Sequence, residues 1–179
     1  MKLHLGCGER YLEGYIHIDI DDFEHIDFKS SVADLNMIKD NSCDLIYASH
    51  VLEYFDLEEV DDVLLEWRSK LKKGGILRIS VPNLQSLIKI YENTKDSTNI
   101  LGPLYGRWNV GGNIIYHRTV YDTDSLQSAL VKNGYVDIRE WDWAKELPKK
   151  YDDYSIAYFP HMNIEHGIQV SLNLECTKP

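Results

Sequence analysis

The residues with the clearest chemical use lie near the start of the chain, in a glycine turn and in a carboxylate that follows it. Gly6, Cys7 and Gly8 come directly after a short apolar run, and Asp19 stands 13 positions after Gly6. Glycine has no Cβ atom, so a ligand can press against bare backbone at such a turn. A carboxylate at the end of the next strand can accept both hydroxyls of a ribose. The pattern therefore predicts a nucleoside site.

A dinucleotide site matches this stretch less well. The third glycine of that fingerprint is missing, and its acidic residue stands roughly 20 positions after the first glycine. We also expect the residues after Gly8 to open a short helix, whose free N–H groups form a partly positive end. The alternative is an ordinary turn with a buried cysteine.

Two more polar residues stand where strands are expected to end. Asp34 follows a brief apolar run at 31–33, and Ser49 ends a nearly continuous apolar run at 44–49. In parallel sheets, ligands bind at the carboxyl ends of the strands. We therefore expect Gly6, Asp19, Asp34 and Ser49 to converge at one edge.

Strands and helices alternate along the chain, which predicts an α/β fold. One expected strand ends at Asp19, and the others lie at 3–5, 31–33, 44–49, 76–81, 135–143 and 167–177. The last shows the alternation typical of an antiparallel strand. This order predicts a Rossmann-like, mostly parallel, doubly wound sheet of about seven strands, with the last strand antiparallel.

Three helices are expected between these strands. A capping box of Asp56 and Glu59 begins the first, Asn83 caps the second, and Asp122 or Thr123 caps the third. The apolar residues that share a buried face are Leu57, Val60, Leu64, Trp67 and Leu71 in the first helix and Leu84, Leu87, Ile88 and Tyr91 in the second.

Length and composition limit the class of protein. The 179 residues suit a single domain, 1–179, and the net charge of −10 argues against binding nucleic acid. No apolar run approaches the roughly 20 residues of a membrane span. The three cysteines are far apart, which is typical of buried thiols in a reducing compartment. We expect a cytoplasmic protein without membrane association, and the sequence carries no signal of its oligomeric state.

Periodicity disappears at 94–121, a segment rich in glycine and aromatic residues. A loop this long is usually functional or mobile. Tyr105, Trp108, Tyr116 and Tyr121 could stack on a sugar or a flat ring, or simply form a partly buried loop. His161 and His166 flank a glutamate, but no third ligand is evident, so no metal site is expected.

Taken together, these stretches resemble the small stand-alone class I S-adenosylmethionine-dependent methyltransferases. The resemblance covers nearly the whole chain and rests on LHLGCG, HIDID, ADL, CDLIYASHVLEYF, LKKGGILRISVPN, LVKNGYVDIREW and VSLNLECTK, in that order. The first helix of that family is nearly absent here, and no helices precede the first strand.

The resemblance implies S-adenosylmethionine as cofactor and S-adenosylhomocysteine as product. The methionine part would lie against Gly6, Cys7 and Gly8, Asp19 would hold the ribose, and Ile20 would also contact the cofactor. Asp34 would meet the adenine amino group and the Leu35 N–H a ring nitrogen. Ser49 and His50 would lie beneath the cofactor.

A sulfonium already activates the methyl group, so the protein mainly aligns an acceptor and excludes water. We expect a small-molecule acceptor, with transfer to a hydroxyl of a sugar-like or aromatic compound. A general base helps with an oxygen acceptor, and His117 in the 94–121 loop is the candidate. It is alternatively a loop histidine hydrogen-bonded to backbone.

Two other functions stay open at this stage. One is a cofactor-binding partner subunit that has lost catalysis. The other is a nicotinamide-dependent oxidoreductase, because Tyr91 and Lys95 match a Tyr-x-x-x-Lys pair. That pair lies at the end of a helix and early in the chain, which disfavours the oxidoreductase.

Overall fold

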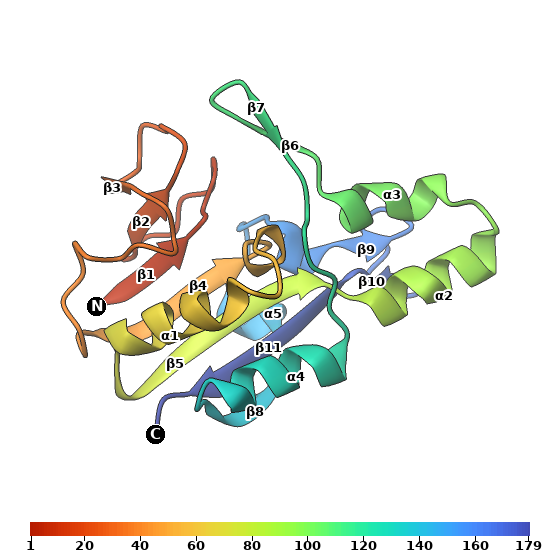
Figure 1. The fold of residues 1–179 in the computed structure, drawn as a ribbon. Coiled ribbons are helices and arrows are strands. Elements are labelled where there is room, and N and C mark those ends of the chain that lie inside the picture. Colours follow the sequence, from red (N-terminus) through yellow and green to blue (C-terminus); the bar gives the residue numbers. More distant parts are fainter.

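A seven-stranded sheet runs through the middle of the protein, for which a computed structural model describes residues 1–179 (Figure 1). Its order is β3-β2-β1-β4-β5-β11-β8. The strands are β1 (Lys2–Leu5), β2 (Ile16–Asp19), β3 (Phe28–Lys29), β4 (Cys43–Ser49), β5 (Leu71–Pro82), β8 (Val136–Glu140) and β11 (Ser171–Thr177).

The strand directions confirm the predicted sheet. β1, β2, β3, β4 and β5 pair in parallel, and β11 pairs antiparallel with both β5 and β8. The carboxyl ends of β1, β2, β4 and β5 therefore meet at one edge, which we call the carboxyl edge. The turn after β1 and the segment after β4 both lie there.

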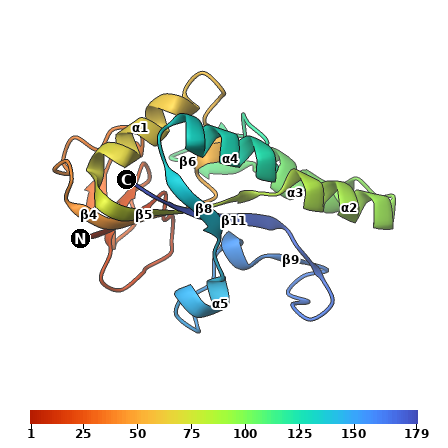
Figure 2. The ribbon, with the colours of Figure 1, turned by 90° about the horizontal axis from the view of Figure 1, so that it is seen from below.

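Helices α1 (Val60–Lys70) and α4 (Thr123–Lys132) cover one face of the sheet (Figure 2). The main apolar core lies beneath them and includes Leu64, Trp67 and Leu126, which are completely buried. Asp56 and Glu59 exchange the two hydrogen bonds of the predicted capping box, although the regular helix begins at Val60.

The predicted buried face of α1 is wrong at one position. Leu57 is 76% exposed, because it lies in the turn before the helix begins. Val63, which the step of three and four skipped, is buried instead. In α2 (Leu84–Thr94), the inward residues are Leu87 and Ile90. The predicted face is therefore wrong at two other positions, since Ile88 and Tyr91 face solvent.

The opposite face of the sheet is covered by irregular segments, with the single-turn helix α5 (Trp143–Glu146) and the short 3-10 helix η2 (Tyr154–Ile156) (Figure 2). Its apolar part is small and centres on Leu12, Tyr47 and Trp141. Buried polar groups fill the rest: the Tyr47 hydroxyl donates to Asp153, and Ser80 donates to Asn173 over 2.6 Å. Hydrogen bonds replace the helix packing that is missing there.

The buried imidazole of His4 on this face predicts acid sensitivity. Burial, and then the nearby His17 and His25, lower the pKa of His4 from 6.5 to about 3. Protonation of His4 is therefore unfavourable in the folded state, whereas the unfolded chain binds this proton below pH 6.5. The stabilisation is fully present above pH 6.5 and decreases as the pH falls below that value. Because of this residue, the free energy of unfolding should be about 2 kcal/mol lower at pH 5 than at pH 7.

Urea unfolding of the wild type and of His4→Gln at pH 7 and pH 5 measures this effect. The glutamine variant, which does not titrate, should lose about 2 kcal/mol less between the two values. Equal losses in both proteins would place the acid sensitivity elsewhere.

Two local predictions near the start of the sheet are wrong. The third strand is β3, Phe28–Lys29, and not 31–33, where the Ala33 N–H donates to the Ser31 hydroxyl in a side-chain turn. No helix opens after Gly8. The chain makes isolated turns instead, closed by hydrogen bonds such as that from the Arg10 N–H to the Cys7 carbonyl.

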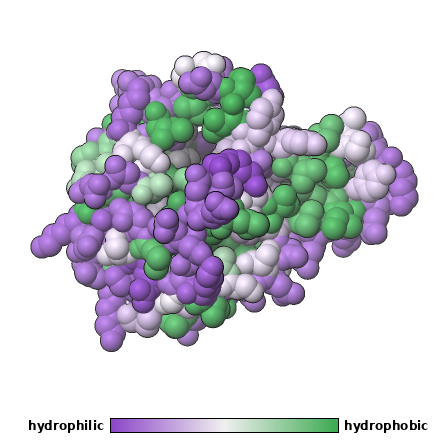
Figure 3. Space-filling view, viewed as in Figure 1, coloured by the Kyte–Doolittle hydropathy of each residue, from purple (hydrophilic) through white to green (hydrophobic).

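The aperiodic segment 94–121 is partly regular. It contains helix α3 (Thr98–Tyr105) and a hairpin of β6 (Trp108–Val110) and β7 (Asn113–Ile115), which projects beyond the carboxyl edge in Figure 1. The segment shows no periodicity because α3 buries none of its residues. Apolar side chains gather over α2 and α3 in Figure 3, and Leu101 is among the exposed ones.

The strand predicted at 167–177 is divided into β10 (Ile168–Gln169) and β11. The short elements without a counterpart in the sequence prediction include the 3-10 turn η1 (Leu52–Tyr54) after β4 and β9 (Tyr158–Phe159), which pairs with β10. Each spans only two or three residues, which is too short for a periodic pattern. A helix long and apolar enough to cross a membrane is absent.

Candidate functional site

The glycine turn follows β1 at the carboxyl edge and has the backbone that the sequence predicted. Gly6 and Gly8 both have positive φ angles, +61° and +54°. A Cβ on Gly6 would lie 2.3 Å from a Val51 methyl, so this glycine is required by packing. A Cβ on Gly8 would meet nothing within 4 Å. Gly8 therefore presents bare backbone to open space.

Asp19 ends β2 and is bound to the same turn. One carboxylate oxygen accepts the Gly8 N–H at 2.8 Å, and the other accepts the Asp21 N–H at 2.9 Å. Each oxygen keeps a lone pair for a further donor. The structure thus joins the two predicted halves of the nucleoside site, with Ile20 exposed beside them.

Cys7 lies in this turn but is not reactive. Its thiol is buried, and burial, followed by the charge of Asp19, raises its pKa to about 12. A protonated thiol is a poor nucleophile. Cys7 therefore contributes backbone and volume to the turn.

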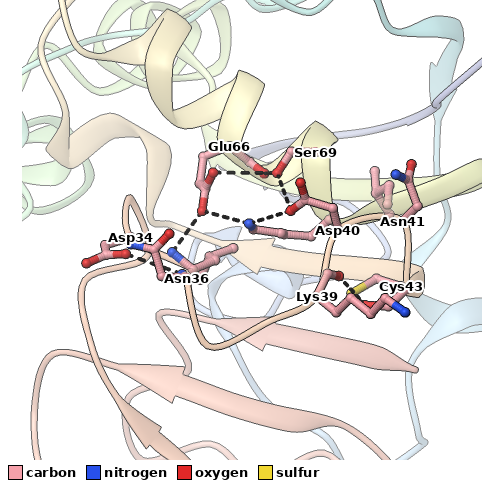
Figure 4. Close-up of polar contacts among 12 residues, drawn as sticks. Asp34, Asn36, Lys39, Asp40, Asn41, Cys43, Glu66 and Ser69 are labelled. Carbon is pink, nitrogen blue, oxygen red and sulfur yellow. Dashed lines mark hydrogen bonds and ion pairs between the residues drawn. The ribbon is translucent and has the colours of Figure 1, made fainter.

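The structure corrects one predicted contact after β3. The Leu35 N–H, expected at an adenine nitrogen, already donates to Glu66 Oε1 over 2.9 Å (Figure 4). The same carboxylate oxygen lies 3.3 Å from Lys70. Asp34 is exposed, and its side chain points away from this cluster in Figure 4. Asp34 is therefore available to a ligand, whereas the Leu35 N–H is not.

His50 follows β4 in a left-handed backbone conformation, with φ of +55°. Such a conformation is uncommon outside glycine and clusters at functional sites. His50 Nε2 lies 2.8 Å from the Ser171 hydroxyl. Ser49, the residue before it, has a buried hydroxyl without a hydrogen-bond partner. The end of β4 thus combines a fixed imidazole with an unsatisfied hydroxyl.

Glu53 is the functional candidate that the sequence prediction missed. Its side chain is completely buried, and neither carboxylate oxygen has a hydrogen-bond partner. Oε1 lies 3.2 Å from His50 Nδ1, with unsuitable angles for a hydrogen bond, and 3.7 Å from His117 Nε2. The available signal was the short spacing, since Glu53 follows His50 by three positions just after β4.

A tyrosine completes this group. The Tyr121 hydroxyl is buried and also lacks a partner, and burial, followed by the charge of Glu53, raises its pKa. We call Glu53, His50, His117 and Tyr121 the carboxylate cluster. A buried carboxylate without hydrogen bonds is unfavourable, and such groups are concentrated where function requires them.

The ring of His117 is enclosed. It meets the Tyr54 ring edge to face at 4.7 Å between centroids, and a Cβ on Gly106 would lie 1.8 Å from its Nε2. Burial lowers the pKa of His117, while Glu53 opposes this effect. The imidazole is therefore mainly neutral near pH 7, the form that a general base needs. Its role as base stays a prediction.

Three of the four aromatics predicted to stack on a substrate are exposed, and their role stays a prediction; the fourth, Tyr121, is buried. Tyr105 ends α3, Trp108 begins β6, and Tyr116 follows β7. They lie on the segment that leads to His117. The structure places no group of three or more candidate metal ligands together.

The comparisons agree with this arrangement. Residues 3–79 match a family model described as a methyltransferase domain. No curated protein sequence matches the chain. The matched stretch contains β1 to β4 and most of β5, so it includes every element of the candidate cofactor half.

Solved structures match the fold over nearly the whole chain. A SAM-dependent methyltransferase from Archaeoglobus fulgidus is 20% identical, with 99% of this chain and 85% of that chain covered and a TM-score of 0.59. A possible histamine N-methyltransferase from Thermotoga maritima is 15% identical, with 99% and 82% covered and a TM-score of 0.61. The 1,6-didemethyltoxoflavin-N1-methyltransferase of Burkholderia thailandensis, solved with its substrate and S-adenosylhomocysteine, is 13% identical, with 99% and 70% covered and a TM-score of 0.54.

The fold is therefore that of the class I S-adenosylmethionine-dependent methyltransferases. Within it, residues 3–79 match the model of a methyltransferase domain. The matched domain and the fold indicate S-adenosylmethionine as the cofactor.

Proposed function

We propose that this protein transfers the methyl group of S-adenosylmethionine to a hydroxyl of a small sugar-like or aromatic molecule. The observation that carries the proposal is the junction of Gly8 and Asp19, which sets bare backbone beside a carboxylate at the carboxyl edge. The sulfonium of the cofactor supplies an already activated methyl group. The protein has to bind the cofactor and the acceptor, orient them toward each other and exclude water.

The residues at this edge fit the cofactor. The open space at Gly8 admits a ligand against the backbone, and Asp19 keeps lone pairs for the ribose hydroxyls. Ile20 and Asp34, both exposed, would flank the base. Asp34 can accept one hydrogen bond from an exocyclic amino group. The Leu35 N–H is not available to the base, because it donates to Glu66.

The carboxylate cluster would handle the acceptor proton. Neutral His117 accepts the proton that the hydroxyl loses, and Glu53 stabilises the resulting imidazolium at 3.7 Å. This is the arrangement of a base and a carboxylate that orients it. Tyr105, Trp108 and Tyr116 would close over the acceptor from the neighbouring segment and exclude water.

Removing the ribose contact tests the cofactor half. Asp19→Asn should weaken S-adenosylmethionine binding by about 2 kcal/mol, because the amide keeps one acceptor oxygen but loses the charge and the second acceptor. Titration calorimetry measures the dissociation constant. Asp22→Asn, a change of the same chemistry at an exposed neighbour, is the matched control and should leave it unchanged.

Thermal unfolding of the free Asp19→Asn protein separates binding from folding, since Asp19 also holds the Gly8 turn. An unchanged dissociation constant in a folded variant contradicts the proposed ribose contact.

A cofactor-binding partner subunit is the second candidate. The exposed apolar side chains of α2 and α3 favour it, because contiguous apolar surface often marks a protein interface. Binding of S-adenosylmethionine without methyl transfer to any acceptor in a labelled-methyl screen would support this candidate.

A further inference from the structure

A cavity of about 450 Å³ lies away from the glycine turn. It lies where the first turns of α2 meet β10, the end of β8 and the start of β11. The end of β5 leads directly into α2, so the cavity opens at the same edge of the sheet as the cofactor half. We propose that this cavity is a remote subsite for a multiply hydroxylated, sugar-like part of the acceptor. This inference rests on the proposed methyl transfer and narrows its acceptor.

The lining of the cavity is mostly polar. Only three of its twelve residues are hydrophobic. On the α2 side, the Ser86 hydroxyl, the Gln85 side-chain amide nitrogen and the Lys89 ammonium have no hydrogen-bond partner within the protein, whereas the Gln85 backbone N–H donates to Asn83. Glu140, at the end of β8, is likewise unpaired. The cavity therefore offers free donors and acceptors side by side.

This mixture favours hydroxyl groups over the other ligand classes. One lysine opposite one glutamate leaves the cavity with no net charge, so it does not suit a polyphosphate. An apolar or flat aromatic ligand would leave these polar groups unpaired, which is unfavourable. A hydroxyl both donates and accepts a hydrogen bond, so several hydroxyls on one ring can satisfy several wall groups. The Trp141 ring supplies an apolar wall for the C–H face of such a ring.

The floor of the cavity is preformed. Ser171 donates to the Tyr154 carbonyl at 2.6 Å, and Asn173 donates to the Ser155 carbonyl at 2.9 Å while accepting from Ser80. These side chains are fixed by protein partners before any ligand arrives. A fixed floor lowers the entropy lost on binding.

Two features connect the cavity to the methyl-transfer edge. The Ser171 hydroxyl lies 2.8 Å from His50 Nε2, and the opposite nitrogen of that imidazole faces Glu53. In addition, Ser80 on β5 is the register partner of both Ser49 on β4 and Asn173 on β11. Two strand spacings make about 10 Å, so the cavity lies about that far from the end of β4. One additional sugar ring of the acceptor would span this distance. A ligand in it would therefore be a remote part of the acceptor, and not the hydroxyl that reacts.

Nuclear magnetic resonance on the full chain tests this subsite. The probes are methyl glycosides of mono- and disaccharides and, for comparison, catechol, each at about 10 mM, tenfold above a weak dissociation constant of ~1 mM. The disaccharide glycosides should shift the Trp141 indole and Gln85 amide signals, and Ser86→Trp, which fills the cavity, should abolish these shifts. Glu92→Trp, on the exposed part of the same helix, should retain them.

A second variant guards against misfolding of Ser86→Trp. Lys89→Ala should weaken the glycoside shifts at least threefold. Shifts that are absent, that are caused as strongly by catechol, or that persist in both variants would overturn the subsite. Calorimetry with S-adenosylmethionine runs in parallel. Cofactor binding without glycoside shifts rejects only the subsite, whereas a failure of cofactor binding rejects the proposed function.

Discussion

Gly8→Val should abolish S-adenosylmethionine binding, with a loss of at least about 100-fold in affinity. The space beside Gly8 is open, so the new side chain meets no protein atom within 4 Å of its Cβ. It would instead occupy the position against which the cofactor must lie. A β-branched residue at a φ of +54° is also strained, which disturbs the turn that Asp19 holds.

Gly14→Val is the matched control for this change. Gly14 also has a positive φ, +80°, and open space at its Cβ, but it lies outside the cofactor turn. Its variant should show a similar loss of stability in thermal unfolding and nearly unchanged cofactor affinity. Normal binding by Gly8→Val, measured by calorimetry, would show that the turn is not the floor of the cofactor site.

His117→Ala should lower the turnover number about 100-fold or more while the cofactor dissociation constant changes less than twofold. The reason is that a general base contributes 10²–10⁴-fold and acts only in the chemical step. The ring also packs against Tyr54 and Gly106, so the alanine variant loses stability as well. His117→Gln separates the two roles, because it fills much of the space but does not accept the proton.

The pH dependence provides an independent reading of the same residue. Burial lowers the pKa of His117 below its ordinary 6.5, so the active neutral form exists above that lowered value. Turnover should rise with pH through a point below 6.5 and then stay level through neutral pH. This rising limb should disappear in His117→Gln. A glutamine variant with normal turnover would assign His117 a purely structural role.

The sheet and the cofactor half were predictable because both repeat simple local rules. Strand length, apolar runs and the glycine turn predicted β1, β4 and their order, and the positions of the strand ends predicted that Asp19 lies near the glycine turn. Asp19 and Gly8 are 11 residues apart, so their contact follows from a single parallel strand pair. Patterns of this kind need no knowledge of tertiary packing.

The carboxylate cluster was harder to predict because it depends on distant partners. Glu53 and His117 are 64 positions apart, and they meet only because the backbone of 118–119 hydrogen-bonds to the Glu53 carbonyl. The Leu35 error has the same origin, since its partner Glu66 is 31 positions away on α1. The cavity is a similar case, because residues of α2, β8, β10 and β11 together form its walls.

The carboxylates around the glycine turn also affect what happens after the reaction. Asp19 and Asp21 place two negative charges close together at the edge where a cationic sulfonium would lie. Methyl transfer removes that positive charge, so the demethylated nucleoside would be attracted less strongly than the methyl donor. These two carboxylates would therefore favour release of the product and binding of a new methyl donor.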